Sequence, residues 1–146
     1  MHCAVKTTSG NLDKLQRIQN YGPRIITGNY DYINIRGVNL VRTLSWHTDR
    51  ERCTYFNAVL MFKSINGLVT DYLSDSVVMS CEVHDRTTRL TDSMDVSVPY
   101  CRTETRKRSF IYNGSRIWNN LDDNLKHCLD IDCFKRSYKT LYCNNV

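Results

Sequence analysis

Apolar residues recur every three or four positions along most of this chain, which is the spacing of an amphipathic α-helix. The pattern predicts helices over residues 12–27, 38–44, 48–66, 114–121 and 132–142, with one or two further helical turns over 68–73. We therefore predict a mainly α fold, a small helical domain of about five helices.

The ends of these helices carry local signals. Thr48 and Glu51 have the spacing of a capping box, in which each side chain bonds the backbone of the other, so the helix over 48–66 is the clearest one. Pro23 lacks a backbone donor and crowds the preceding turn, which predicts a kink or break near Gly22. Gly28 is a suitable helix stop.

Two short segments have residues typical of strands: residues 96–98 alternate valine with serine, and residues 109–112 contain two aromatic residues and an isoleucine. They predict the two strands of a short β-hairpin, with a run of basic residues between them. Asn113 is then a good cap for the helix over 114–121, since its side chain can accept a hydrogen bond from the first turn.

Other segments have little apolar periodicity. Residues 74–96 are rich in Ser, Thr and Asp, which predicts a long mobile loop. Residues 1–11 are expected to fray. No repeat or composition shift divides the chain, so we expect a single domain over 1–146.

Composition narrows the class of protein. Hydrophobic residues make up 41% of the 146 and charged residues 24%, which excludes disordered and fibrous classes. No apolar run approaches the roughly 18 residues of a membrane span, and residues 1–10 lack the apolar core of a signal peptide. We expect an intracellular protein, nuclear or cytoplasmic and not secreted, whose seven cysteines are free thiols.

Candidate catalytic and metal-binding residues are weak. The adjacent acids Asp122 and Asp123 follow no hydrophobic strand, so a turn at a helix end explains them better than a two-metal polymerase site. There is no G-x-S-x-G elbow and no glycine-rich phosphate loop. His127, Cys128, Cys133 and Cys143 are too unevenly spaced for a typical zinc site. We expect no cofactor and no metal.

A basic stretch near the predicted hairpin is more informative than the net charge of +5. Lys and Arg side chains neutralise phosphates, and aromatic faces stack bases. The candidate nucleic-acid-binding residues are Arg102, Arg106, Lys107, Arg108, Tyr112 and Arg116. The alternative is a solvated hairpin whose aromatic side chains face the core. Trp46 and Trp118 lie beside apolar residues, and we interpret both as core anchors rather than base-stacking platforms.

Several motifs occur in an order that resembles a known family. The chain reads LDKLQRIQN over 12–20 and RIITG over 24–28, then LSW, MFKSING and DYL over 44–46, 61–67 and 71–73. KRSFIYNG, IWNNL and FK follow over 107–114, 117–121 and 134–135. This series is similar to the C-terminal, post-polymerase region of non-LTR retrotransposon reverse transcriptases of the jockey/RTE-like type.

The resemblance implies a fragment that lies after an RNA-directed DNA polymerase domain. The catalytic aspartates of that family lie upstream of this region, so it implies that the chain is not an enzyme. Its expected role is that of an accessory region that contacts RNA template or target DNA, with the polymerase domain of a retroelement protein as a second possible partner. No membrane or small-molecule partner is expected.

Two positions depart from the family pattern. Tyr21-Gly22-Pro23 stands where the family has two alanines, and Asp122 stands where it has a proline. Such drift is typical of a decayed copy. Two alternatives therefore stay open: a structural or protein-docking domain that binds no nucleic acid, and a relic fragment without a function.

Overall fold

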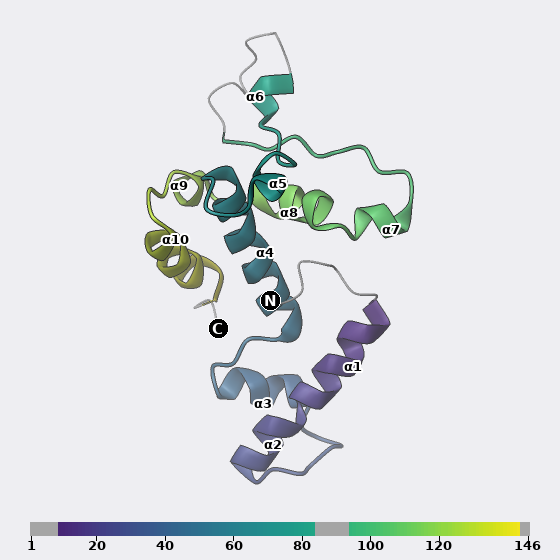
Figure 1. The fold of residues 1–146 in the computed structure, drawn as a ribbon. Coiled ribbons are helices and arrows are strands. Elements are labelled where there is room, and N and C mark those ends of the chain that lie inside the picture. Colours follow the sequence, from purple (N-terminus) through teal and green to yellow (C-terminus); the bar gives the residue numbers. More distant parts are fainter. Residues whose placement is uncertain (1–8, 84–93, 144–146) are drawn as a thin grey trace.

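The computed structural model describes residues 9–83 and 94–143. Most of these residues are helical, which confirms the mainly α fold. In chain order the helices are α1 (Ser9–Gln19), α2 (Tyr21–Thr27), α3 (Gly37–Thr43), α4 (Asp49–Ile65), α5 (Asp71–Ser74), α6 (Ser80–Val83), α7 (Glu104–Lys107), α8 (Phe110–Asn119), α9 (Asp123–Lys126) and α10 (Ile131–Tyr138), followed by a π-helical turn, η1 (Lys139–Cys143). In Figure 1, α4 links a lower lobe of α1–α3 to an upper cluster that contains α5, α8, α9 and α10.

The start of α4 is fixed by the predicted capping box. Thr48 Oγ accepts from the Glu51 amide at 3.4 Å, and Glu51 Oε2 accepts from the Thr48 amide at 2.8 Å. Two amides that the helix itself leaves without partners are thereby satisfied. Beyond the other end of α4, Gly67 has a φ of 64°, which suits a residue without a Cβ.

Three aromatic rings, one each from α4, α8 and α10, form the centre of the upper cluster. Phe62 and Phe134 stack with ring centroids 4.6 Å apart, and Trp118 lies 6.1 Å from Phe134. All three side chains are at most 1% exposed, so Trp118 is the core anchor that the sequence predicts. Helices α4 and α8 approach closely because residue 114 is glycine: an added Cβ would meet Met61 at 2.7 Å.

The predicted hairpin is wrong, because residues 109–112 begin a helix. Ser109, and not Asn113, caps α8: its hydroxyl accepts from the Tyr112 amide at 3.5 Å. Phe110 and Trp118 then lie on the buried side of the helix. Aromatic and β-branched residues fit a half-buried strand in general, but here the spacing of the buried positions is helical and the cap decides the conformation.

The segment predicted as a long loop contains regular structure where it is described. Helix α6 covers residues 80–83, and Met79 forms an isolated antiparallel bridge with Val96. Residues 84–93 of the predicted loop lie outside the described residues. So do residues 1–8 of the segment expected to fray, and α1 begins at Ser9, before the predicted start of the first helix.

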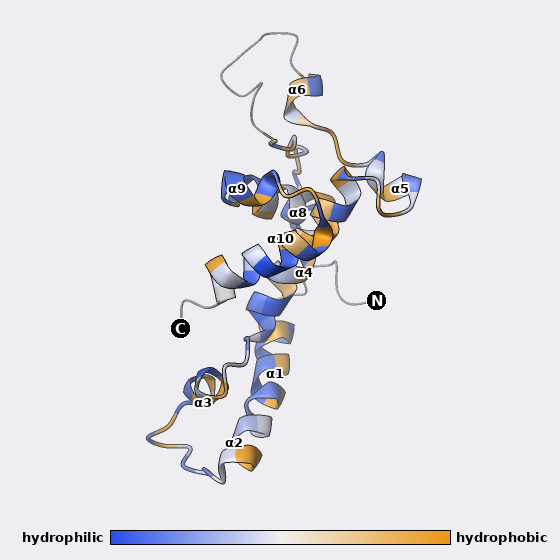
Figure 2. Ribbon diagram, turned by 90° about the vertical axis from the view of Figure 1, so that its left-hand side faces the viewer, coloured by the Kyte–Doolittle hydropathy of each residue, from blue (hydrophilic) through white to orange (hydrophobic). Residues whose placement is uncertain are grey.

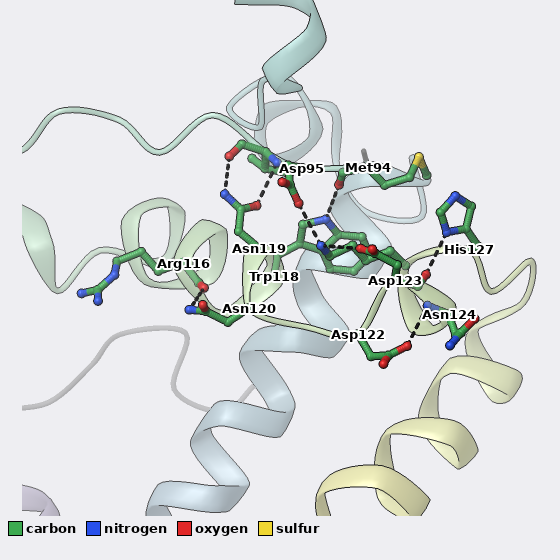
Figure 3. Close-up of polar contacts among 12 residues, drawn as sticks. Met94, Asp95, Arg116, Trp118, Asn119, Asn120, Asp122, Asp123, Asn124 and His127 are labelled. Atoms are coloured by element: carbon green, nitrogen blue, oxygen red, sulfur yellow. Dashed lines mark hydrogen bonds and ion pairs between the residues drawn. The ribbon is translucent and has the colours of Figure 1, made fainter. Parts of the chain in front are cut away.

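Residues 94–96 are held over the core by side chains from α8 and α9 (Figure 3). Trp118 Nε1 donates to the Met94 carbonyl at 2.6 Å. Asn119 accepts from the Val96 amide at 2.9 Å and donates to the Val96 carbonyl at 2.8 Å, as a neighbouring strand would. The Trp-Asn pair of the sequence motif therefore has a structural role: it attaches a distant segment to the core.

In the lower lobe the break predicted near Gly22 lies between α1, which ends at Gln19, and α2, which begins at Tyr21 and contains Pro23. Arg24 is only 5% exposed, and its guanidinium donates to the carbonyls of Asp31 at 2.9 Å and Ile35 at 2.8 Å. These bonds fix the connection from α2 to α3. Gly28 ends α2 with a φ of 64°, as expected for a left-handed helix stop.

Most of the apolar side of this first helical segment faces solvent. Leu12 is buried, whereas Leu15, Ile18, Ile25 and Ile26 are 48–68% exposed. Figure 2 shows hydrophobic positions along α1 and at the end of α2, away from the upper cluster. We call these four exposed side chains the apolar face.

Candidate nucleic-acid interface

The predicted basic residues gather where α7 turns into α8, on the side of the upper cluster opposite α9 and α10 (Figure 1). Thr103 caps α7 by accepting from the Arg106 amide at 3.3 Å. Asn113 then joins the two helices, because its Nδ2 donates to the carbonyls of Lys107 at 2.7 Å and Ser109 at 3.3 Å. The turn between α7 and α8 is thus fixed by side-chain bonds. We call it, with its six candidate residues, the basic corner.

The cations of the basic corner differ in their exposure to solvent and in whether an acidic side chain pairs with them. Arg102 and Arg106 are exposed, and Arg108 is half-buried. Lys107 donates to Glu104 at 2.6 Å, and this hydrogen bond and charge raise the pKa of Lys107 and lower the pKa of Glu104. Lys107 is therefore already partly neutralised, so the arginines are the stronger candidates for a phosphate.

Tyr112 and Arg116 lie one turn apart on the outer side of α8. The Arg116 guanidinium is 5.9 Å from the centroid of the Tyr112 ring, within the range of a cation–π contact. In Figure 3 the Arg116 side chain points away from the Trp118 network. In a strand, Phe110 and Tyr112 would lie on the same face. In the helix they lie on different sides, so Phe110 faces the core while Tyr112 is half-buried.

The acidic pair Asp122 and Asp123 has structural partners. Asp122 caps α9 by accepting from the Asn124 amide at 2.9 Å. Asp123 accepts from Lys126 at 3.1 Å, and Lys126, whose side chain is 4% exposed, also donates to Asp95 at 2.8 Å. Burial would lower the pKa of Lys126, but the hydrogen bonds and charges of the two aspartates outweigh it and raise that pKa. The turn at a helix end is the better interpretation of this pair.

Of the four zinc candidates, Cys128 and Cys133 lie close enough to share a hydrogen bond, and the side chain of Cys143 lies outside the described residues. Within the described residues no group of three or more His, Cys, Asp or Glu side chains is placed to hold a metal ion. His127 Nδ1 lies 2.8 Å from the Asp123 carbonyl. Burial, with the hydrogen bond and charge of Cys133, raises the pKa of the Cys128 thiol.

Trp46 does not lie where the sequence predicts. The indole was expected in the core, but it is 41% exposed and lies against Gly22, where an added Cβ would meet its ring at 3.3 Å. The turn that places it depends on Ser45, whose φ of 54° is in the left-handed region. No local signal in the sequence marks a serine for that conformation.

Comparisons with known proteins give no relative: no family model matches the chain, and neither a curated protein nor a solved structure does. Within the part of the chain that the structure covers, none of the helices has the length and apolar character needed to cross a membrane.

Proposed function

We propose that this chain is a non-catalytic accessory region of a retroelement reverse transcriptase that contacts RNA template or target DNA through the basic corner. One observation carries the proposal: among the described residues, no carboxylate pairs with Arg102, Arg106, Arg108 or Arg116. Residues 97–121 hold five Lys or Arg side chains and a single acid, Glu104. The ordered sequence motifs supply the family context.

The chemistry of the corner suits a phosphate backbone better than a folded acidic surface. Arginine binds phosphate oxygens through two parallel N–H bonds. Arg106 and Arg116 come from two helices that Asn113 joins, and the Tyr112 ring lies beside the Arg116 guanidinium, so a strand at the corner would meet both cations and an aromatic ring. Such contacts carry no sequence information, which is consistent with holding a strand rather than reading it.

The experiment is fluorescence anisotropy with a labelled single-stranded RNA between 50 and 200 mM salt, comparing the wild type with Arg106→Ala/Arg116→Ala. Each lost phosphate contact should reduce the slope of log K against log salt by about 0.7, so the double variant should lose about 1.4. Arg17→Ala/Arg42→Ala is the matched control, because both residues are exposed in the lower lobe. Undetectable binding at 50 mM, or equal slopes for both double variants, would refute the proposal.

A second candidate function, protein docking, is favoured by the apolar face. Burying Leu15, Ile18, Ile25 and Ile26 from their present exposure would contribute about 4–7 kcal/mol to an association. The partner that this proposal names is the polymerase domain encoded by the same element. Sedimentation of the two proteins together, with Ile18→Lys/Ile25→Lys as the variant, tests it: association that is absent, or that the variant leaves unchanged, rules it out.

The relic alternative makes a different prediction. A decayed copy without selection for folding would show no cooperative thermal transition. A single sharp transition, measured by circular dichroism, would argue against it.

A further inference from the structure

An open groove of about 520 Å³ lies where the lower lobe meets the end of α10. Its volume is within the range of about 300–1,000 Å³ that is usual for small-ligand sites. The groove is lined by Gln19, Ser45, Trp46, His47, Glu51, Arg52, Tyr55, Phe56 and Lys139. These residues come from α1, the connection between α3 and α4, the first half of α4, and η1. We call it the aromatic groove.

The connection that forms one wall is held firmly. Gln19 Nε2 donates to the His47 carbonyl at 2.7 Å, and Gln16 Oε1 accepts from the Asp49 amide at 3.1 Å. At the end of α3, the Ser45 amide donates to the Arg42 carbonyl at 2.8 Å and the Trp46 amide to the Val41 carbonyl at 2.9 Å. This pair of bonds is a Schellman turn, with serine where glycine is usual. Trp46 is thereby set in place before any ligand binds.

Three aromatic side chains give the groove flat apolar surfaces. Trp46 and Phe56 are each 41% exposed, which is unusual for side chains that bury favourably. Tyr55 lies beside Phe56, with ring centroids 5.4 Å apart. A planar ligand that enters the groove can therefore cover apolar ring surface that water now contacts.

The charge of the groove is positive. Lys139 Nζ lies 5.9 Å from the Tyr55 ring centroid, and Arg52 lines the same groove. Across residues 9–83 and 94–143, no carboxylate forms an ion pair with either cation. Glu51, the acid in the lining, already accepts from the Thr48 amide. The groove therefore suits a ligand with an anionic group, which would pair with the two cations.

We propose that the aromatic groove binds one nucleotide of a single strand, with the base against the rings of Trp46 and Phe56 and the phosphate at Arg52 and Lys139. A nucleotide places a planar ring and an anion next to each other in every repeat, which matches both properties of the groove. An acidic peptide would satisfy the cations but would not regularly supply a flat ring. The proposal extends the proposed nucleic-acid contact to a second surface, and either surface can fail without the other.

The test uses the full chain and an adenosine tetranucleotide at 50 mM salt. Trp118 is fully buried, so saturable quenching of tryptophan fluorescence reports on Trp46. With a labelled tetranucleotide, anisotropy should show at least about ten-fold weaker binding for Trp46→Leu, since stacking on one ring contributes about 1–3 kcal/mol. Arg52→Ala/Lys139→Ala should weaken binding similarly, because it removes both cations.

Controls separate this groove from the basic corner. Tyr72→Ala removes an 81% exposed ring elsewhere, and Arg42→Ala removes an exposed cation outside the groove; both should bind the tetranucleotide normally. Arg106→Ala/Arg116→Ala should also bind it normally, even where long RNA is lost. The proposal is overturned if quenching does not saturate, if the Arg52/Lys139 variant binds as well as Arg42→Ala, or if an acidic tetrapeptide binds more tightly than the tetranucleotide. Circular dichroism must show that each variant keeps its helices.

Discussion

Replacing Gly114 by alanine adds one methyl group where α8 crosses α4. The new Cβ would meet Met61 Cγ and Sδ at 2.7 Å and Phe110 Cε2 at 3.1 Å, whereas non-bonded carbon atoms are most stable about 3.5–4.0 Å apart. Met61 is fully buried, so its thioether has no solvent-filled space to move into. The helices must separate, or the surrounding rings must shift.

The expected change in stability follows from two opposing effects. An extra methyl group in a well-packed core destabilises a protein by about 1–3 kcal/mol. Alanine is favoured over glycine inside a helix by about 0.8–1.0 kcal/mol, which offsets part of that loss. The free energy of unfolding of the Gly114→Ala variant should therefore be lower by up to about 2 kcal/mol, and its Tm should fall by up to about 8 °C for a chain of this length.

Urea denaturation and thermal circular dichroism measure both quantities. Gly10→Ala is the matched control: the same substitution in α1, with nothing within 4 Å of the new Cβ, should leave stability unchanged or raise it. Adding Met61→Ala to Gly114→Ala should destabilise less than the sum of the single changes, because the cavity accepts the methyl group. A Gly114→Ala protein as stable as the Gly10→Ala protein would refute the close approach of α4 and α8.

Three further changes test other parts of the fold by the same denaturation assay. Lys126→Met should cost roughly 3 kcal/mol at pH 7 by leaving Asp95 without its partner. Because folding raises the pKa of Lys126, its contribution is fully present at neutral pH and begins to be lost only above about pH 10.4, so the difference between wild type and variant should shrink as the pH rises further. Asn119→Ala should cost about 1–3 kcal/mol by removing both bonds to Val96, whereas an unchanged urea midpoint would mean that the clamp does not form. Gly28→Ala should cost about 1–2 kcal/mol from its φ of 64° alone, because nothing lies within 4 Å of the added Cβ, and equal stability would exclude that conformation.

The parts of the fold that sequence predicts well are those set by neighbouring residues. The capping box of Thr48 and Glu51 needs only a spacing of three, and the structure has it. The stop at Gly28 and the kink before Pro23 likewise follow from single residues. At the start of α8 two local signals conflict: Ser109 is as good a helix cap as Thr48, but the aromatic and β-branched residues after it predict a strand.

Features set by distant contacts were not predictable. Periodicity shows which side of a helix is apolar, but not whether another element covers it: Leu15 and Ile18 have helical spacing and lie exposed. The position of Trp46 depends on a left-handed serine and on Gly22, which is distant in the sequence. For the basic corner, the residue types were visible in sequence, whereas the partial neutralisation of Lys107 by Glu104 required the structure.

The sequence motifs behind the family resemblance contain residues with a structural role. The side chains of Gln16, Arg24 and Asn119 bond backbone atoms far along the chain. Similarity at these positions therefore indicates a similar fold rather than a shared function. Arg106 and Arg52, in contrast, lie outside these motifs and make no ion pair with any described residue. Binding that is lost when they are changed, at an unaltered free energy of unfolding, would therefore assign nucleic-acid contact to the surface itself. If binding is lost only in variants that also lose their folded structure, the sequence resemblance would indicate a shared fold and no shared binding function.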